Sequence, residues 1–91
     1  MAFMYILECR DGTFYTGSTT HLRARVAQHR EGDGAKYTAR RRPIRVRYYE
    51  EYARIGEAFA REKMVQGWNH ERKEWLIEHG PGVKVVAGME I

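Results

Sequence analysis

Two short apolar runs joined by Asp11-Gly12 constrain this chain more than any other feature. The first run covers residues 3–9 (Phe-Met-Tyr-Ile-Leu-Glu-Cys), and the second covers residues 13–17 (Thr-Phe-Tyr-Thr-Gly). Asp-Gly between two such runs predicts a β-hairpin, because glycine adopts the positive φ that a tight turn requires. Since side chains alternate along a strand, Tyr5 and Tyr15 can face the same side of the sheet. A small antiparallel sheet is therefore the expected base of the fold.

The segment after the hairpin has helical periodicity and an unusual inner face. We expect a helix over residues 21–30, capped at its N-terminus from residues 18–20 (Ser-Thr-Thr). Its apolar stripe begins at Leu22 and continues, at helical spacing, onto Arg25 and His29. An alternative is that the stripe ends early and that both polar residues are solvated at its edge.

A second strand-like segment follows a basic, glycine-containing loop over residues 31–42. Residues 44–52 alternate with a period of two, which is typical of a strand. One face of this strand is expected to be apolar and the other basic and aromatic. The apolar face would hold Ile44, Val46 and Tyr48, and the other face Arg45, Arg47 and Tyr49.

Two helices complete the pattern. The first is expected over residues 55–66, with Glu62 on the same stripe as its buried positions Ile55, Ala58, Phe59 and Val65. Asn69 can cap the second, which would hold Trp75 and Leu76 inward. The order ββαβαα predicts an α+β fold in which helices flank a three-stranded antiparallel sheet.

Length and composition limit the class of protein. A chain of 91 residues forms one domain, which we expect over residues 1–79. A tail over residues 80–91 either adds a short strand or stays loose. The single cysteine, Cys9, excludes an intramolecular disulfide and a cysteine-based zinc site. No apolar run reaches the ~20 residues of a membrane span, so we expect no membrane partner and a reducing, cytoplasmic compartment.

The positive charge is concentrated in one part of the chain. Residues 21–47 contain nine Lys or Arg and two acidic residues, a net charge of +7. The remaining residues contain seven basic and ten acidic residues, a net charge of −3. Such segregation favours contact with a polyanion, most simply nucleic acid. A solvated basic loop is the alternative.

Five polar residues on the predicted inner faces supply the parts that phosphodiester hydrolysis needs. The carboxylate of Glu62 can bind Mg²⁺ or Mn²⁺, since hard cations prefer oxygen ligands. Arg25, a neighbour of His29, can neutralise charge that develops on a phosphate. A phenol such as Tyr5 or Tyr15 among cations is expected to have a lowered pKa and to act as a base. Alternatively, the tyrosines are core aromatics and Glu62 forms a structural salt bridge with Arg25.

The order and spacing of these residues resemble the GIY-YIG nuclease domain, and most of all its small stand-alone bacterial members. The opening motif is similar to residues 3–5 (Phe-Met-Tyr), and the second motif to residues 15–17 (Tyr-Thr-Gly). Arg25, His29 and residues 60–63 (Ala-Arg-Glu-Lys) follow at similar offsets. Further matches are residues 34–38, the Arg-rich turn before Pro43, and Trp68, Lys73 and Leu76. The resemblance covers residues 4–78.

The resemblance implies an active site on the face of a three-stranded sheet. Glu62 would bind one Mg²⁺ or Mn²⁺, and Tyr5 would be the base that activates water. Tyr15 would support the site by hydrogen bonding or share the role of base. Arg25 would stabilise the scissile phosphate, and His29 would orient Tyr5 or accept its proton.

The resemblance also implies a surface for the nucleic-acid backbone. We expect it to include Arg23, Lys36, Thr38, Arg40, Arg41 and Arg42. The chain departs from the family pattern at Phe3 and Met4, which replace glycine and isoleucine. We interpret Asn69 as a helix cap and not as the late asparagine of the family.

The sequence therefore predicts a metal-dependent DNA endonuclease acting on flap, branched or single-stranded DNA in repair or recombination, with RNA left open as a substrate. One alternative is a nucleic-acid-binding module without catalysis, or a subunit of a partner-dependent nuclease or homodimer. Another is a protein-interaction subunit that docks through its aromatic residues Tyr48, Tyr49, Tyr52 and Trp68.

Overall fold

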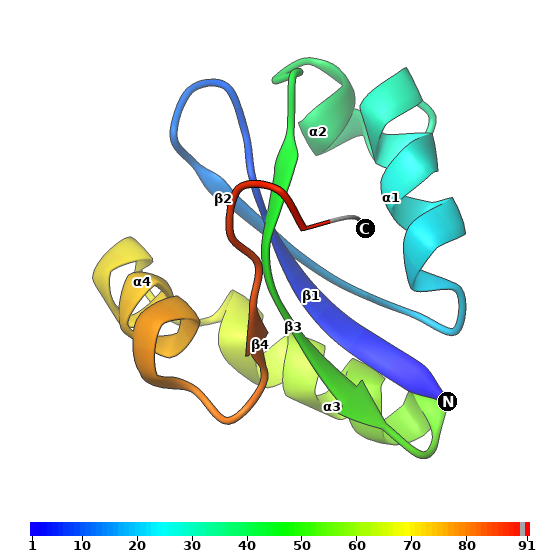
Figure 1. Cartoon of the computed structure of the whole chain (residues 1–91), viewed down its shortest axis with the longest axis vertical. Helices are drawn as coiled ribbons and strands as arrows, with labels where there is room; N and C mark the ends of the chain where they lie inside the picture. The colour runs from blue at the N-terminus through cyan, green and yellow to red at the C-terminus, as the bar shows by residue number, and fades with distance from the viewer. Residues whose placement is uncertain (90) are drawn as a thin grey trace.

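A computed structural model describes residues 1–89 and 91 as an α+β fold built on one antiparallel sheet (Figure 1). The strands, in the spatial order β2-β1-β3-β4, are β1 (Ala2–Glu8), β2 (Phe14–Thr19), β3 (Arg45–Tyr52) and β4 (Val83–Lys84). The helices are α1 (Leu22–Glu31), α2 (Lys36–Ala39), α3 (Ile55–Gln66) and α4 (His70–His79). The α+β class is confirmed, but the sheet has four strands and not three. The fourth comes from the predicted tail, and the domain boundary at residue 79 stays a prediction.

The hairpin forms where the sequence predicts it. Gly12 adopts a φ of +84°, and the Asp11 carboxylate accepts hydrogen bonds from the backbone N–H and hydroxyl of Thr13. In the resulting register, Tyr5 pairs with Gly17 and Leu7 pairs with Tyr15. Both tyrosines consequently lie on the same face of the sheet, as predicted.

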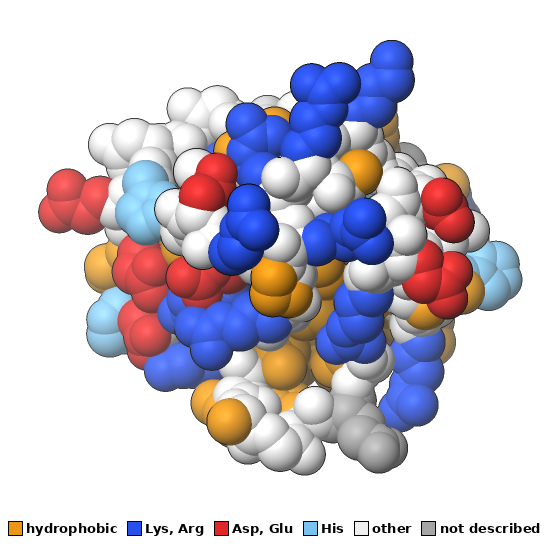
Figure 2. Space-filling view, turned by 90° about the horizontal axis from the view of Figure 1, so that it is seen from above, with side chains coloured by type: hydrophobic (Ala, Val, Ile, Leu, Met, Phe, Trp, Pro, Cys, Tyr) orange, Lys and Arg blue, Asp and Glu red, His pale blue; other side chains and the backbone are white. Residues whose placement is uncertain are grey.

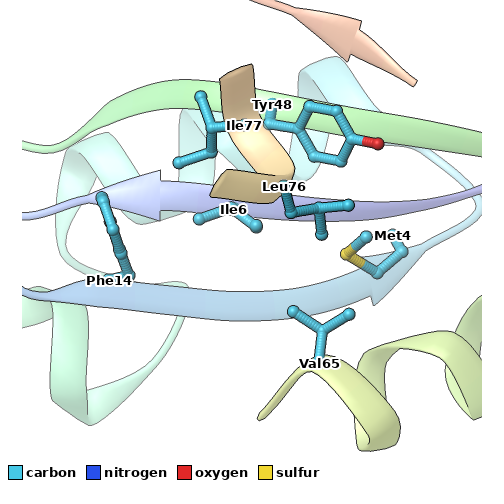
Figure 3. Close-up of a cluster of buried hydrophobic side chains, with 7 residues drawn as sticks. All are labelled: Met4, Ile6, Phe14, Tyr48, Val65, Leu76 and Ile77. Atoms are coloured by element: carbon cyan, nitrogen blue, oxygen red, sulfur yellow. The ribbon is translucent and has the colours of Figure 1, made fainter. Parts of the chain in front are cut away.

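The two faces of the sheet carry separate apolar clusters. Figure 3 shows one cluster, in which side chains from β1, β2 and β3 meet Val65 of α3 and Leu76 and Ile77 of α4. On the opposite face, Leu22 and Val26 of α1 pack against Tyr5, Leu7, Cys9, Ile44 and Val46. The sheet thus separates α1 and α2 from α3 and α4, as Figure 1 also shows.

The predicted faces of β3 are wrong in one respect, because the strand contains a β-bulge. The partner of Ile6 is Tyr48, whereas the partner of Leu7 is Val46, so Arg47 is an extra residue in β3. One extra residue reverses the side of the sheet to which later side chains point. Tyr48 therefore lies in the cluster with Ile6, on the face opposite Val46.

The predicted boundaries of the helices agree with the structure better than the predicted buried faces do. In α3, Glu62 is buried with Ala58 and Val65, but Ile55 and Phe59 are 45% and 50% exposed, contrary to expectation. The reason is that α3 packs on the sheet through the side that carries Ala58, Glu62 and Val65, and Ile55 and Phe59 lie outside that contact.

The caps of the other two long helices differ from each other. Asn69 caps α4 by accepting a hydrogen bond from Arg72 N–H, as predicted, and Leu76 is buried. Trp75 is not inward but 60% exposed. The expected cap of α1 is wrong: His21 occupies the N-cap position, and its side chain makes no capping hydrogen bond with the described residues.

The described helices include none that is both long and apolar enough to span a membrane.

Candidate active site

A chain of three hydrogen-bonded side chains crosses the space between the sheet and α1. The hydroxyl of Tyr5, on β1, lies 2.8 Å from Nε2 of His29, on α1. Nδ1 of His29 lies 2.8 Å from the hydroxyl of Thr38, on α2. All three residues are buried, with at most 1% of their surface exposed. Helical spacing does therefore place His29 on the inner stripe of α1, and the alternative of a solvated position is wrong for this residue.

The rings of both tyrosines lie close to the ring of His29. The ring centroids of Tyr15 and His29 are 5.2 Å apart, and those of Tyr5 and His29 are 5.7 Å apart. The Tyr5 ring passes directly over Gly17, where an added Cβ would stand 2.5 Å from the phenolic oxygen. A glycine in this position of the second motif is therefore a steric requirement of the site.

The expectation of a lowered tyrosine pKa is wrong for this structure. Burial, the neighbouring Tyr15 and the Glu62 carboxylate together raise the pKa of Tyr5 to about 12, against the lowering effect of Arg25. Burial also raises the pKa of Tyr15. Desolvation outweighs the one nearby cation, so Tyr5 is a protonated phenol at neutral pH. Its proton must leave as water is deprotonated if Tyr5 is to act as a base.

His29 is neutral in the same environment. Burial and the positive charge of Arg25 lower the pKa of His29 to about 4. An uncharged imidazole has one ring nitrogen that donates and one that accepts. At neutral pH one ring nitrogen therefore has a free lone pair, but the low pKa makes the ring a weak base.

Arg25 is held by neutral acceptors and not by a carboxylate. Its Nη2 donates to the backbone carbonyl of Gly34 at 2.7 Å, and its Nη1 donates to Oε1 of Gln28 at 2.9 Å. Among the described residues, none forms a salt bridge with Arg25, so the alternative of a structural ion pair with Glu62 is wrong. Its guanidinium charge is available to a phosphate.

Glu62 is a buried carboxylate that forms no salt bridge with the described residues. Only 8% of the residue is exposed. Its Oε1 accepts from the Ser18 hydroxyl at 2.6 Å, and its Oε2 accepts from Gln66 Nε2 at 2.7 Å. By contrast, the buried Glu50 is paired with Arg61 at 2.9 Å. Because a buried charge without a counter-ion is costly, Glu62 is a favourable place for a cation.

The donor set fits a weakly held hard cation better than a closed metal site. Among the described residues, no three His, Cys, Asp or Glu side chains form a cluster able to hold a metal. Glu62 would supply one carboxylate and leave the remaining coordination positions to water and phosphate oxygens. Mg²⁺ often binds in this way, with one or two carboxylates and several retained waters.

The basic segment forms a surface next to these residues. Figure 2 looks onto the end of the molecule that carries α1 and α2, where Lys and Arg side chains gather across the middle and acidic side chains lie towards both sides. The side chains of Arg23, Lys36, Arg40 and Arg42, all in the basic segment, are exposed. Arg41 is partly buried, pairs with Asp11 at 3.2 Å and stacks on the ring of Tyr37.

Thr38 does not belong to this surface. It is fully buried, and its hydroxyl contacts His29 and the carbonyl of Ala35. We therefore correct its assignment from nucleic-acid contact to the interior of the site.

Three contacts of the site are missed by reasoning from the sequence. Gln66 follows Glu62 by four residues on one helix, so the pairing could have been found from helical spacing. Ser18 and Thr38 could not, because their contacts depend on how distant elements pack. Ser18 bonds to Glu62 across 44 residues of sequence.

The comparisons with known proteins agree with this geometry. Residues 1–74 match the GIY-YIG catalytic domain. The chain belongs to the GIY-YIG family. This confirms the resemblance found in the motifs and places the chain among nuclease domains.

Several small proteins resemble this GIY-YIG chain over most of its length. A UPF0213 protein of Halobacterium salinarum is 45% identical over 77 residues, which are 85% of this chain and all of that protein. A UPF0213 protein of Staphylococcus epidermidis is 41% identical over 86% of this chain and 95% of its own length. The solution NMR structure of a UPF0213 protein from Bacillus halodurans shares 39% identity and a TM-score of 0.55, covering 86% of this chain and 84% of that one.

Proposed function

We propose that this GIY-YIG domain is an endonuclease that hydrolyses phosphodiester bonds in DNA with the help of one Mg²⁺ or Mn²⁺ ion. The observation that carries the proposal is the buried Glu62 carboxylate, which forms no salt bridge with the described residues and lies close enough to Tyr5 and Tyr15 for its charge to oppose their ionisation. A structural role alone would not require a desolvated charge without a counter-ion. Flap, branched or single-stranded DNA in repair or recombination is the proposed substrate class.

Each side chain of the site has a separate role in the proposed reaction. Glu62 holds the cation, which supplies positive charge to the phosphate when bound. Ser18 and Gln66 orient the two carboxylate oxygens. Arg25 binds the scissile phosphate and compensates the negative charge that builds up on it in the transition state.

Tyr5 and His29 move the proton. As a water molecule attacks phosphorus, a new P–O bond forms, the bond from phosphorus to the leaving oxygen breaks, and the leaving oxygen takes a proton from solvent. The proton of the attacking water passes to the Tyr5 oxygen while the Tyr5 proton passes to Nε2 of His29. The phenol is thus regenerated and the imidazole becomes charged, so the high pKa of Tyr5 is no obstacle. Burial is the main cause of the low pKa of His29, and a phosphate on Arg25 would offset the smaller contribution of the Arg25 charge. Tyr15 packs against His29 and supports its position.

A gel assay with labelled duplex, single-stranded, flap and branched DNA tests the proposal. Wild-type protein and Glu62→Ala are each run with Mg²⁺, Mn²⁺ or EDTA. We expect metal-dependent cleavage by the wild type, loss of cleavage in Glu62→Ala, and similar DNA binding by both. A matched RNA set decides between the two nucleic acids.

The same assay tests the alternative of a nucleic-acid-binding module or a partner-dependent subunit. That alternative requires salt-sensitive binding by both proteins and no metal-dependent product from any substrate. Cleavage retained by Glu62→Ala would contradict the proposed mechanism, although not the family membership.

A further inference from the structure

Thr38 has its hydroxyl bonded on two sides, and the direction of these bonds can be worked out. The hydroxyl donates to the carbonyl oxygen of Ala35 at 3.2 Å. A hydroxyl has a single proton, so the same oxygen can only accept from Nδ1 of His29, 2.8 Å away. Nδ1 must then carry the proton of the neutral ring.

The other ring nitrogen is fixed as a consequence. In a neutral imidazole with a protonated Nδ1, Nε2 has a free lone pair. Nε2 therefore accepts the hydrogen bond from the Tyr5 hydroxyl at 2.8 Å. With the opposite tautomer, Nε2 would donate to Tyr5 and could not receive its proton.

The backbone around His29 leaves little room for another arrangement. An added Cβ at Gly34 would stand 2.4 Å from Nδ1 and 2.9 Å from Cα of His29. The carbonyl of Gly34 accepts from Arg25, so this glycine contacts both residues that α1 contributes to the site. The Gly34 backbone therefore lies against the imidazole ring beside Nδ1, and neither His29 nor Thr38 is exposed to solvent.

We propose that Thr38 is a positioning residue that fixes His29 as the Nδ1–H tautomer, so that Nε2 is free to take the proton of Tyr5. The part of the inference that concerns catalysis rests on the proposed function, whereas the tautomer itself does not. In the proton transfer, the O–H bond of Tyr5 breaks and an N–H bond forms at Nε2. The resulting imidazolium keeps its Nδ1–H bond to Thr38.

Side-chain ¹H–¹⁵N NMR spectra test the tautomer directly, because protonated and unprotonated ring nitrogens differ in chemical shift. The signals of His29 are identified by comparison with His29→Gln. We expect a protonated Nδ1 and an unprotonated Nε2 in the wild type. A protonated Nε2 would overturn the proposal, whether or not the protein cleaves DNA.

Two substitutions distinguish the effect of the Thr38 hydroxyl from the effect of the size of its side chain. Thr38→Val keeps the shape but removes the acceptor, and we expect a mixture of tautomers and a kcat lower by about 10- to 100-fold, with KM unchanged. Thr38→Ser keeps the acceptor and should retain the wild-type tautomer and a rate within about twofold. If the valine variant does not fold, the wild-type and serine spectra still decide the outcome.

Thr16→Val is the matched control. Thr16 is also a buried threonine, but its hydroxyl has no hydrogen-bond partner among the described residues. Its replacement should change neither the spectrum of His29 nor kcat. An unchanged tautomer in Thr38→Val, or an equal loss of rate in Thr16→Val, would overturn the proposal. Absence of cleavage by the wild type would reject the nuclease and leave the NMR result to decide the role of Thr38.

Discussion

At the scale of single residues, the interior of the site is a set of polar groups that satisfy one another. His29 uses both ring nitrogens, one towards Tyr5 and one towards Thr38. Glu62 uses both carboxylate oxygens, towards Ser18 and Gln66. Hydrogen bonding reduces the cost of burying polar groups, but it does not supply the positive charge that Glu62 lacks. The carboxylate is therefore the least compensated group in the site.

Protonation of His29 should weaken the fold as the pH falls. The folded-state pKa of about 4 lies below the value of 6.5 for an unperturbed histidine, so the unfolded state binds more protons between these pH values. The contribution is complete above pH 6.5 and is lost as the pH approaches 4, with a slope of up to about 1.4 kcal/mol per pH unit. Urea unfolding from pH 4 to 7 measures it. His29→Gln should show a shallower dependence over this range, and an equal dependence would contradict the assignment.

Gly17→Ala should displace the Tyr5 ring. The added methyl would stand 2.5 Å from the phenolic oxygen and 2.6 Å from Cζ, too close for either to remain in place. We expect a loss of about 1–3 kcal/mol in the free energy of unfolding and at least a tenfold lower cleavage rate. Gly56→Ala is the control, since no described atom lies within 4 Å of its Cβ position and alanine favours a helix. Normal cleavage by Gly17→Ala would refute the account of the second motif.

At the scale of secondary-structure elements, the sequence predicts a feature correctly where that feature depends only on residues close together in the chain. The Asp-Gly turn and the boundaries of α3 follow from turn chemistry and helical periodicity. The faces of β3 do not, because the bulge at Arg47 depends on pairing with β1. Residues two apart, such as Val46 and Tyr48, lie on the same face of the sheet only where the strand has no bulge.

The exposure of Ile55 and Phe59 on α3 also could not be predicted from the sequence. Periodicity identifies a stripe that includes Ile55, Phe59 and Glu62, but it does not show how much of that stripe the sheet covers. Contacts with β1 and β2 bury Ala58, Glu62 and Val65 and leave Ile55 and Phe59 half exposed. The position of the carboxylate was thus predictable, and the positions of the neighbouring apolar residues were not.

Removal of the α4 cap should affect stability but not chemistry. Asn69 Oδ1 accepts from Arg72 N–H at 2.8 Å, at the start of a helix that supplies Leu76 and Ile77 to the core. Asn69→Ala should lower the free energy of unfolding by about 1 kcal/mol, and Asn69→Asp by much less. Thermal unfolding measures both variants. A large loss of cleavage at normal stability would show instead that Asn69 acts as the late asparagine of the family.

At the scale of the whole molecule, the fold brings together residues that are far apart in sequence. Tyr5 and Tyr15 come from the hairpin, Arg25 and His29 from α1, and Glu62 from α3. The helices lie on opposite faces of the sheet, and Glu62 bonds to Ser18 of the outer strand β2, whose side chain alternates with Gly17 and so lies on the α3 face. The charge of Glu62 still acts on Tyr5 and Tyr15. The residue types were predictable from motif spacing, whereas the partners Ser18 and Thr38 required the structure.

The separation of charge should govern nucleic-acid binding. Arg40 and Arg42 are exposed in the basic segment, whereas Arg41 is engaged by Asp11 and Tyr37. Replacement of Arg40 or Arg42 by Gln should weaken DNA binding and reduce the slope of log K against log salt by about 1. Fluorescence anisotropy at several salt concentrations measures the slope. Arg54→Gln, at the start of α3, should leave the slope unchanged, and an equal effect there would exclude a localised surface.

The most direct test of the account is the single-turnover cleavage rate of Glu62→Gln, with Mn²⁺ binding measured on the same protein. Glutamine preserves the size of the side chain but removes the charge that would hold the cation. Glu51→Gln, at an exposed position on β3, is the matched control. We expect Glu62→Gln to lose Mn²⁺ binding and at least 100-fold in rate while retaining DNA affinity, and Glu51→Gln to behave as the wild type. Wild-type Mn²⁺ binding and cleavage in Glu62→Gln would contradict the central claim.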